Sequence, residues 1–374
     1  MDAGRKLRRL SVDPAPRLSA ELTAGVLAAA QAAESTDAAP PLNDEQLMAL
    51  QHPGGLPADA EVTHFPMRQA VDRDDATGDL VGYGQLIEQG LSPADRDRPT
   101  GTLFVHPDHR RQGLGRALVA RMHEATAGNV HLWAPNDSAA AQRLARAAHM
   151  VPVRELLVMG RSLEEPLPRA PVPAGLKIRN FVISRDQPGF LEVNARAFAD
   201  HPEQGRLGAA GLRTKIREPW FDRSGFLLAV DPSVAPSFAT GAPASEYVTG
   251  DDDGDDEDGA TVVPGLTKDG RIVGFHWTKE HVDEDGGERV GEVYVLGVDP
   301  DTEGRGLAKA LLVRGLARLR EHGCRRAILY VEGDHDKAIG LYEKYGFRTV
   351  KRDVLYAQHL VLPAADEPGR APQV

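Results

Sequence analysis

Two short glycine-containing stretches have the residue types and spacing of a phosphate-binding loop. Residues 106–119 read HPDHRRQGLGRALV, residues 299–312 read DPDTEGRGLAKALL, and an offset of 193 aligns Gly113 with Gly306. Backbone N–H groups of such a loop, together with the positive end of the next helix dipole, can bind a phosphate. A helix start that merely needs small residues would explain one copy equally well. Two copies at the same place of a repeated unit favour anion binding.

Each loop must be held by a strand before it and a helix after it. Apolar runs at 101–105 and 292–298 precede the loops, and leucines at helical spacing follow them. The sequence therefore predicts the order strand, loop, helix twice. The chain has 374 residues, a length that is typical of two domains.

The spacing excludes two common phosphate motifs. The dinucleotide pattern G-x-G-x-x-G fails because Leu118 and Leu311 occupy the place of its third glycine, and there is no P-loop ending in Gly-Lys-Ser/Thr. What remains is R-x-x-G-x-G at Arg110, Gly113 and Gly115, which resembles the acyl-CoA pyrophosphate loop of the GCN5-related N-acetyltransferase superfamily. The resemblance implies acetyl-CoA as a co-substrate and no metal.

The second loop departs from this pattern at two positions. Glu303 stands where the superfamily has Gln or Arg, and Ala308 replaces the last glycine. Alanine is acceptable because only backbone N–H groups are needed there. Glu303 would repel a phosphate if it faced inward, so its side chain is expected to point to solvent.

The resemblance also implies the fold class. It is α+β, with two tandem domains, each a mixed, mostly antiparallel sheet flanked by helices. The proline-rich segment 161–175 is expected to be a linker. We therefore expect an N-terminal acetyltransferase-like domain at 1–160, a C-terminal catalytic domain at 176–362 and a tail at 363–374.

Acetyl transfer from a thioester to an amine needs a group that takes the amine proton and a group that protonates the leaving thiolate. By the resemblance these are Glu292, which opens the strand before the second loop, and Tyr342, in the stretch LYEKYGF. A solvated strand end and a core aromatic are the alternatives for each residue alone. Their matching places around one loop favour catalysis. The first half has Pro99 and Ala145 at the corresponding positions, so it is expected to bind acetyl-CoA without turning it over.

Three stretches, NARAFADHPEQG, GFHWTK and GEVYVLGVDP, resemble a tandem-domain branch of the superfamily. That branch acetylates the cysteinyl amine of cysteinyl-glucosaminyl-inositol, a pseudodisaccharide cysteine amide, in the final step of mycothiol biosynthesis. By the resemblance the acceptor contacts are Glu45, Glu203, Lys279, Glu292 and Tyr342. Carboxylates suit an acceptor with many hydroxyls and a free ammonium. A solvated carboxylate and a surface charge are the alternatives for Glu203 and Lys279.

The resemblance marks acetyl-CoA contacts in both halves, along the strand ends, the glycine loops and the stretch after Tyr342. They are Leu103, Phe104, Val105, Arg110, Arg111, Gln112, Gly113, Leu114, Gly115, Leu296, Gly297, Val298, Glu303, Gly304, Arg305, Gly306, Leu307, Ala308, Lys309, Phe347, Arg348, Thr349, Val350, Lys351 and Arg352. Backbone N–H groups near Leu296 and Val298 are further expected to polarise the thioester carbonyl.

Composition excludes several classes of protein. The formal net charge of −11 argues against a general nucleic-acid binder. The single cysteine, Cys324, is expected to be a buried thiol and allows no intrachain disulfide or zinc cluster. The basic N-terminus has no apolar segment behind it, and no segment is long enough to span a membrane. We therefore expect a soluble cytoplasmic protein that works as a monomer, with no membrane partner.

Residues 231–265 are expected to form a disordered loop between two strands. Its run DDDGDDED at 251–258 holds close like charges with no apolar partner, which cannot offset the entropy cost of ordering. A calcium loop is the alternative, but the later glutamate and the flanking helices of an EF-hand are missing from the sequence pattern.

Two other functions stay open on sequence alone. A tandem N-acetyltransferase for another amine, such as an aminoglycoside or a protein N-terminus, would share every catalytic residue. A non-enzymatic acyl-CoA-binding sensor would need the two loops but neither Glu292 nor Tyr342, so the presence of both argues against it.

Overall fold

The structure of the chain is a computed structural model. It describes residues 9–37, 39–51, 60–70, 78–88, 99–199, 205, 207–234, 269–281 and 287–358. The chain packs as two units, one formed by residues 1–156 with 351–374 and the other by residues 157–350. The expected acidic loop from residue 235 onward and the tail at 363–374 lie outside the described residues.

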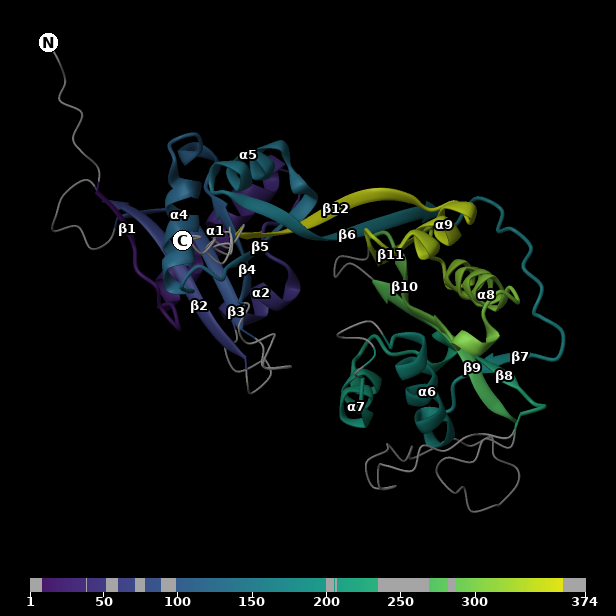
Figure 1. The fold of residues 1–374 in the computed structure, drawn as a ribbon. Helices are drawn as coiled ribbons and strands as arrows, with labels where there is room; N and C mark the ends of the chain where they lie inside the picture. The colour runs from purple at the N-terminus through teal and green to yellow at the C-terminus, as the bar shows by residue number, and fades with distance from the viewer. Residues whose placement is uncertain are drawn as a thin grey trace, which may run out of the picture. The chain divides into compact units, whose positions relative to one another are not determined.

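The first unit is built on a sheet with the strand order β1-β2-β3-β4-β5-β12 (Figure 1). These strands are β1 (Arg9–Val12), β2 (Glu61–Ala70), β3 (Asp79–Glu88), β4 (Thr100–Val105), β5 (His131–Ala134) and β12 (Arg348–Gln358). Strands β4 and β5 run parallel, and the other pairs are antiparallel. The sheet is therefore mixed and mostly antiparallel, as the sequence predicts.

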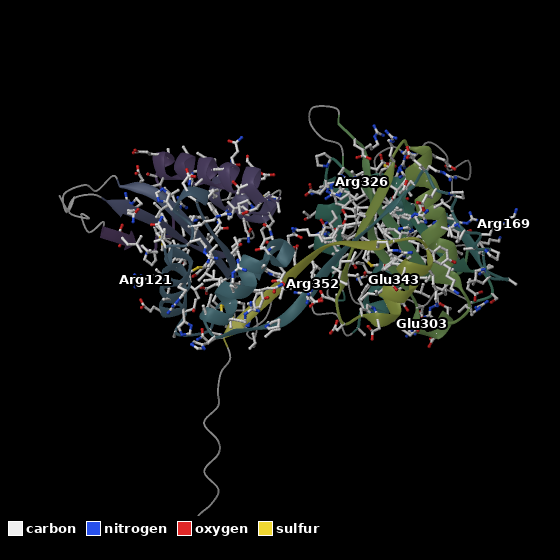
Figure 2. All side chains as sticks on the ribbon, turned by 90° about the horizontal axis from the view of Figure 1, so that it is seen from above. Arg121, Arg169, Glu303, Arg326, Glu343 and Arg352 are labelled. Atoms are coloured by element: carbon white, nitrogen blue, oxygen red, sulfur yellow. The ribbon has the colours of Figure 1, made fainter. Side chains whose placement is uncertain are left out.

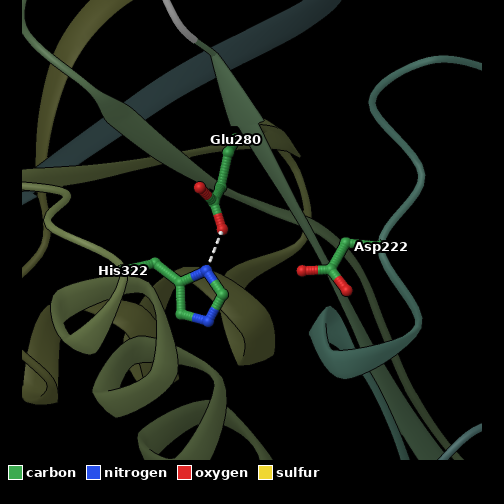
Figure 3. Close-up of side chains that lie close together, drawn as sticks. All are labelled: Asp222, Glu280 and His322. Atoms are coloured by element: carbon green, nitrogen blue, oxygen red, sulfur yellow. Dashed lines mark ion pairs between the residues drawn. The ribbon is translucent and has the colours of Figure 1, made fainter.

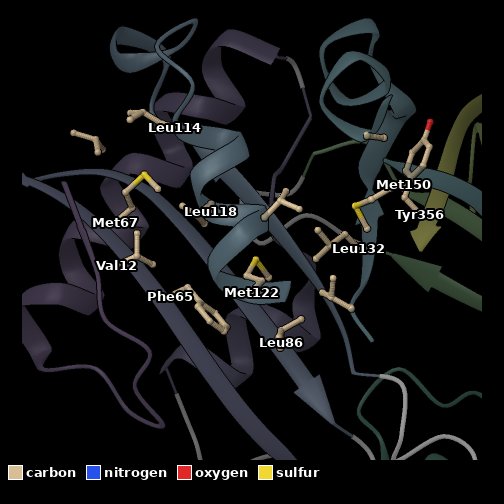
Figure 4. Close-up of a cluster of buried hydrophobic side chains, with 14 of the residues drawn as sticks. Val12, Phe65, Met67, Leu86, Leu114, Leu118, Met122, Leu132, Met150 and Tyr356 are labelled. Atoms are coloured by element: carbon tan, nitrogen blue, oxygen red, sulfur yellow. The ribbon is translucent and has the colours of Figure 1, made fainter. Parts of the chain in front are cut away.

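Helices cover both faces of this sheet. Helices α1 (Ala20–Asp37) and α2 (Asp44–Gln51) pack with Tyr83 and Phe104 on one face. Helices α4 (Leu114–Ala125) and α5 (Ala139–Ala147) share the opposite face with the buried cluster of Phe65, Met67, Leu118 and Met122 (Figure 4). Helix α4 can approach closely because β3 carries a glycine there: a Cβ on Gly84 would lie 2.8 Å from the Met122 sulfur.

The second unit repeats the plan. Its sheet has the order β11-β10-β9-β8-β7, formed by β7 (Lys177–Asn180), β8 (Phe226–Asp231), β9 (Arg271–His281), β10 (Val290–Val298) and β11 (Arg326–Glu332). Strands β10 and β11 are parallel and the other pairs antiparallel. Helices α6 (Ile183–Ala197) and α7 (Ala209–Arg217) cover one face over an aromatic core that includes Phe190, Phe226 and Trp277. Helices α8 (Leu307–Glu321) and α9 (Asp336–Lys344) cover the other.

Two strands run from one unit into the other along the chain. Strand β6 (Met150–Ser162) begins in the first unit and ends in the second, and β12 begins in the second and ends in the first. The sequence-based boundaries place residues 351–358 in the C-terminal domain, and the structure differs there. The cause is backbone pairing, because Val354 lies opposite Ala134 in the ladder of β12 with β5. No local sequence pattern reveals a pairing between residues so far apart. None of the described helices has the length and apolar character needed to cross a lipid bilayer.

Candidate active site

The second glycine loop joins β10 to α8. A 3-10 turn, η6 (Pro300–Thr302), is followed by Gly304 at φ 75° and Gly306 at φ 88°, a backbone conformation that glycine adopts without strain. Gly306 is the N-cap of α8, and a Cβ on it would meet no heavy atom of the described residues within 4 Å. The helix N-terminus therefore faces open space, where its first N–H groups can bind an anion.

The first glycine loop has the same geometry between β4 and α4. The turn η1 (Pro107–His109) is followed by Arg111 at φ 65° and by Gly113 at φ 82°, the N-cap of α4. Around a Cβ on Gly113, too, the described part of the chain leaves 4 Å of open space. With the offset of 193, Arg111 takes the left-handed conformation that Gly304 takes in the other loop. The repeat in sequence is thus a repeat of backbone shape.

A cavity of about 580 Å³ opens beside the first loop. Of the first-half residues predicted to contact acetyl-CoA, all except Gln112 line it: Leu103, Phe104, Val105, Arg110, Arg111, Gly113, Leu114 and Gly115. Its other walls include Trp133 of β5, Ala145 of α5 and Tyr356 of β12. The structure therefore brings these predicted contacts together around a space whose size is typical of a small-molecule site.

The two loops carry opposite charges at one corresponding position. Arg110 donates to both carboxylate oxygens of Asp37, at 2.7 and 2.8 Å. Its counterpart Glu303 pairs with Lys337 of α9 and lies at the surface, half exposed (Figure 2). The Glu303 carboxylate thus points to solvent, as expected, and leaves the loop backbone available to an anion.

A buried aspartate anchors the second loop. Asp299 accepts hydrogen bonds from the Asp301 backbone N–H at 2.9 Å, from Arg196 at 2.9 Å and from Arg271 at 2.8 Å. Burial alone would raise the pKa of Asp299, but the hydrogen bond from Arg196, the one from the Asp301 backbone and the nearby guanidinium charges lower it overall. In the first loop His106 fills this place and accepts a hydrogen bond from Asp108 N at 3.3 Å.

Glu292 lies on β10 where this strand leaves regular pairing. The register with β9 shifts by one residue between Val293 and Val295, a β-bulge that places Tyr294 outside the ladder. Bulges bend a strand and re-aim its side chains, and they are frequent beside active sites. Glu292 itself is 7% exposed and faces Lys279 of β9 directly across the ladder. The structure thus brings together two of the predicted acceptor contacts.

Glu292 also has a partner that sequence reasoning missed. His281, the last residue of β9, has its Nε2 atom 2.6 Å from Glu292 Oε2. The signal was present in the sequence, because Trp277, Lys279 and His281 alternate along one strand and so share a face.

Cations and aromatic rings line the same face. The ammonium of Lys279 lies 4.9 Å from the centre of the Trp220 ring, and Trp220 lies 5.1 Å from Tyr294, centroid to centroid. Lys215 of α7 donates to the Tyr294 hydroxyl. These contacts join residues from three separate segments, so spacing in the sequence could not have predicted them.

Tyr342 lies in α9, in the same buried cluster as Phe347 and Val293, whose side chain lies on the opposite face of β10 from that of Glu292. Its ring centre is 5.8 Å from that of Phe347. Burial raises the pKa of Tyr342 to about 12. The hydroxyl therefore stays protonated at neutral pH and can act as a proton donor.

The remaining predicted contacts fall in different environments. Glu45 is exposed on α2, while its neighbour Gln46 is buried. Glu203 lies outside the described residues. Within the run 347–352, Phe347 is fully buried, and the run crosses from the second unit to the first at Lys351.

One group of side chains in the second unit has the make-up of a metal site. Asp222, Glu280 and His322 point toward one another (Figure 3), and His322 Nδ1 lies 3.1 Å from Glu280. However, the guanidinium of Arg318 already pairs with both carboxylates, with Asp222 and, at 3.0 Å, with Glu280. Because a cation of the protein itself pairs with both acids, the group is a structural ion-pair network that joins β9 to α8.

Comparisons with known proteins agree with this geometry. A family model described as "Acetyltransferase (GNAT) family" matches residues 229–347, and one described as "Acetyltransferase (GNAT) domain" matches residues 70–148. The mycothiol acetyltransferase of Salinispora arenicola is 38% identical over 95% of this chain and 97% of its own length. The corresponding protein of Streptomyces coelicolor is 36% identical over the same shares.

Two solved structures share the fold. A GCN5-related N-acetyltransferase from Sphaerobacter thermophilus has a TM-score of 0.59 at 22% identity and covers 92% of this chain and 94% of its own. A tandem GNAT protein from the clavulanic acid biosynthesis pathway has a TM-score of 0.59 at 17% identity and covers 93% and 98%. The predicted α+β class with two tandem domains is confirmed.

Proposed function

We propose, on the premise that this chain belongs to the mycothiol acetyltransferase family and is an acetyl-CoA-dependent N-acetyltransferase, that its acceptor is the cysteinyl amine of cysteinyl-glucosaminyl-inositol. The observation that carries the proposal is the bulged start of β10. There a buried carboxylate, that of Glu292, lies on the strand that leads into a glycine loop, and Lys279 is its partner in the ladder.

Acetyl-CoA is held by the second loop in this proposal. The pyrophosphate sits in the open space before Gly306, bound by the backbone N–H groups at the start of α8. The thioester then lies along the end of β10, where backbone N–H groups near Leu296 and Val298 stabilise the charge that develops on the carbonyl oxygen.

Proton transfer falls to two side chains. Glu292 takes a proton from the acceptor ammonium, the free amine attacks the thioester carbonyl, and Tyr342 protonates the departing thiolate. The nitrogen loses its second proton as the amide forms, and that proton restores the Tyr342 hydroxyl. Burial raises the pKa of Tyr342 to about 12, so the hydroxyl is protonated at neutral pH, as the role of a proton donor requires. Lys279, Glu45 and Glu203 are proposed to contact the polar parts of the acceptor.

The first unit has a different task in this proposal. Its loop and cavity hold acetyl-CoA, but Pro99 and Ala145 stand at the places of the base and the acid. It therefore binds the co-substrate without transferring it. Because one chain carries both units, we also propose that the protein works as a monomer, in the cytoplasm where acetyl-CoA is made.

The test is release of free CoA from acetyl-CoA in the presence of a panel of amines. The panel contains cysteinyl-glucosaminyl-inositol, an aminoglycoside and a peptide with a free N-terminus. We expect the highest kcat/KM with the first acceptor and a loss of about 10²–10⁴-fold in kcat for Tyr342→Phe. A preference for another amine would overturn the acceptor, and binding of acetyl-CoA without release by any amine would favour a sensor.

A further inference from the structure

The base proposed at Glu292 is largely buried, whereas a side chain in contact with it is open to solvent. The Glu292 side chain is 9% exposed, whereas that of His281, which touches it, is 41% exposed. A base that takes a proton in each turnover must return it to solvent before the next. The contact of 2.6 Å between Glu292 Oε2 and His281 Nε2 is short enough for direct proton transfer.

Strand geometry fixes this contact. In the antiparallel ladder His281 lies opposite Val290, and Lys279 lies opposite Glu292. Residues that alternate along a strand share a face, so His281 reaches Glu292 diagonally. The imidazole stands at the end of β9, between the buried carboxylate and solvent.

The other charges on this face do not compete for the carboxylate through any described ion pair. Arg326 of β11 lies next to Val290 in the ladder, and its guanidinium pairs with Glu288 at 3.6 Å. The ammonium of Lys279 lies over the Trp220 ring. Glu280, the neighbour of both Lys279 and His281 in sequence, belongs to the opposite face, where it pairs with Arg318.

We propose that His281 is a positioning residue that acts through Glu292 and returns the acceptor's proton to solvent. The inference rests on the proposed function. Glu292 first takes the proton from the acceptor nitrogen. The imidazole, with its own proton on Nδ1, then accepts the carboxyl proton on Nε2 and releases the Nδ1 proton to water. A carboxylate and a neutral imidazole with its proton on Nε2 remain, and exchange of that proton with water returns the imidazole to the Nδ1 tautomer for the next turnover.

Two substitutions distinguish the hydrogen bond that His281 makes to Glu292 from the proton transfer proposed for it. Glutamine in His281→Gln can still donate a hydrogen bond to the carboxylate but cannot take a proton from it. His281→Ala removes both abilities and leaves room at an exposed strand end for free imidazole. We expect both variants to lose about 10²-fold in kcat with little change in the KM for acetyl-CoA. Added imidazole is expected to restore His281→Ala in proportion to its concentration and to leave His281→Gln unchanged.

The chain offers a matched control. His322 also pairs with a glutamate, Glu280, at 3.1 Å and has a similarly exposed side chain, 39%, but it lies in the Arg318 network. His322→Gln is expected to keep the kcat of the wild type. Thermal melting of each variant shows that it is folded.

The outcomes are distinct. Full activity of a folded His281→Gln, or no rescue of His281→Ala by imidazole, would overturn the relay while the proposed function stands. Wild-type protein that releases no CoA with cysteinyl-glucosaminyl-inositol or any other amine of the panel would overturn the proposed function, and the relay with it. An equal loss in His322→Gln would show that the effect comes from general damage and would also overturn the relay.

Discussion

In the first unit β3 and β4 stay in register from Gly82 opposite Val105 to Ile87 opposite Thr100, whereas in the second unit β9 and β10 slip by one residue at Tyr294. The glycine loops that follow β4 and β10 have nearly the same shape, with φ 82° at one N-cap glycine and 88° at the other. The units therefore share a loop and differ in the strand that feeds it. Anion binding needs only the loop, whereas the acetyl transfer proposed for the second unit also uses a carboxylate beside the bulge.

A single position illustrates the difference. With the offset of 193, Gly101 corresponds to Tyr294. A Cβ on Gly101 would lie 1.8 Å from the carbonyl oxygen of Gln85, so only glycine allows β4 to pair this closely with β3. In β10 the tyrosine stands outside the ladder instead. The regular pairing of the first unit thus depends on a glycine at the place where the second unit has the bulged tyrosine.

Substitution of the glycine at the start of α8 or of α4 tests most directly whether the two units have different roles. Valine in Gly306→Val would be strained at φ 88° and would fill the open space before α8. We expect this variant to lose acetyl transfer nearly completely. Gly113→Val makes the same change in the first unit and is expected to keep kcat, with at most a defect in stability.

Calorimetric titration with acetyl-CoA supplies the control for this pair. Wild-type protein is expected to bind two equivalents, and each variant one. If Gly113→Val stays folded, binds both substrates and yet stops turning over, the first unit takes part in catalysis and the division of labour is wrong.

A second test asks whether side chains alone make a unit catalytic. Glu292→Gln removes the base without changing its size and is expected to lower kcat by about 10²–10⁴-fold. Adding Pro99→Glu and Ala145→Tyr to that variant places both groups in the first unit. We expect no recovery, because β4 lacks the bulge in its described pairing. The measurement is the steady-state rate of CoA release. A rate of the triple variant above that of Glu292→Gln would show that the bulge is dispensable.

Sequence alone predicted the parts of this molecule that depend on local pattern. The loops at Gly113 and Gly306, the strands before them and the helices after them follow from spacing and periodicity. The return of β12 to the first unit did not, because its pairing with β5 depends on backbone groups from opposite ends of the chain. The contact of His281 with Glu292 was missed because it depends on the pairing of β9 with β10, which alternation along β9 alone does not give.

Asp299 and His106 occupy corresponding places before the two loops, and their contributions to the free energy of unfolding can be compared. Asp299→Asn keeps an acceptor for the Asp301 N–H but removes a carboxylate that Arg196 and Arg271 share. Hydrogen bonds to charged groups contribute about 1.5–3 kcal/mol each, so we expect a loss of about 2 kcal/mol in the free energy of unfolding at pH 7. His106→Asn places the same residue in the first loop and should cost less than about 0.5 kcal/mol, because asparagine caps well.

The contribution of Asp299 to the free energy of unfolding should depend on pH. Its folded pKa is lowered, so its contribution to stability is complete above the unfolded value of about 3.9 and is lost as the pH falls through the folded one. The difference between wild type and Asp299→Asn in urea unfolding should therefore shrink below about pH 4. A difference that persists unchanged at lower pH would assign the effect to packing rather than charge.

The smallest change in stability and activity is expected from deleting the acidic segment that the second half of the sequence has and the first half lacks. Residues 250–259, GDDDGDDEDG, contain no apolar side chain, and they lie outside the described residues. The described strands on either side are joined without them, since Asp231 lies opposite Arg271 and the Arg271 N–H donates to the Val234 carbonyl at 3.0 Å. Loop-closure entropy changes only with the logarithm of length, so deleting these ten residues should change the free energy of unfolding by roughly 0.3 kcal/mol. Urea unfolding and steady-state kinetics should both match the wild type, and added calcium should not raise its melting temperature. A clear loss of stability or activity, or stabilisation by calcium, would show that the acidic run binds something the second unit uses.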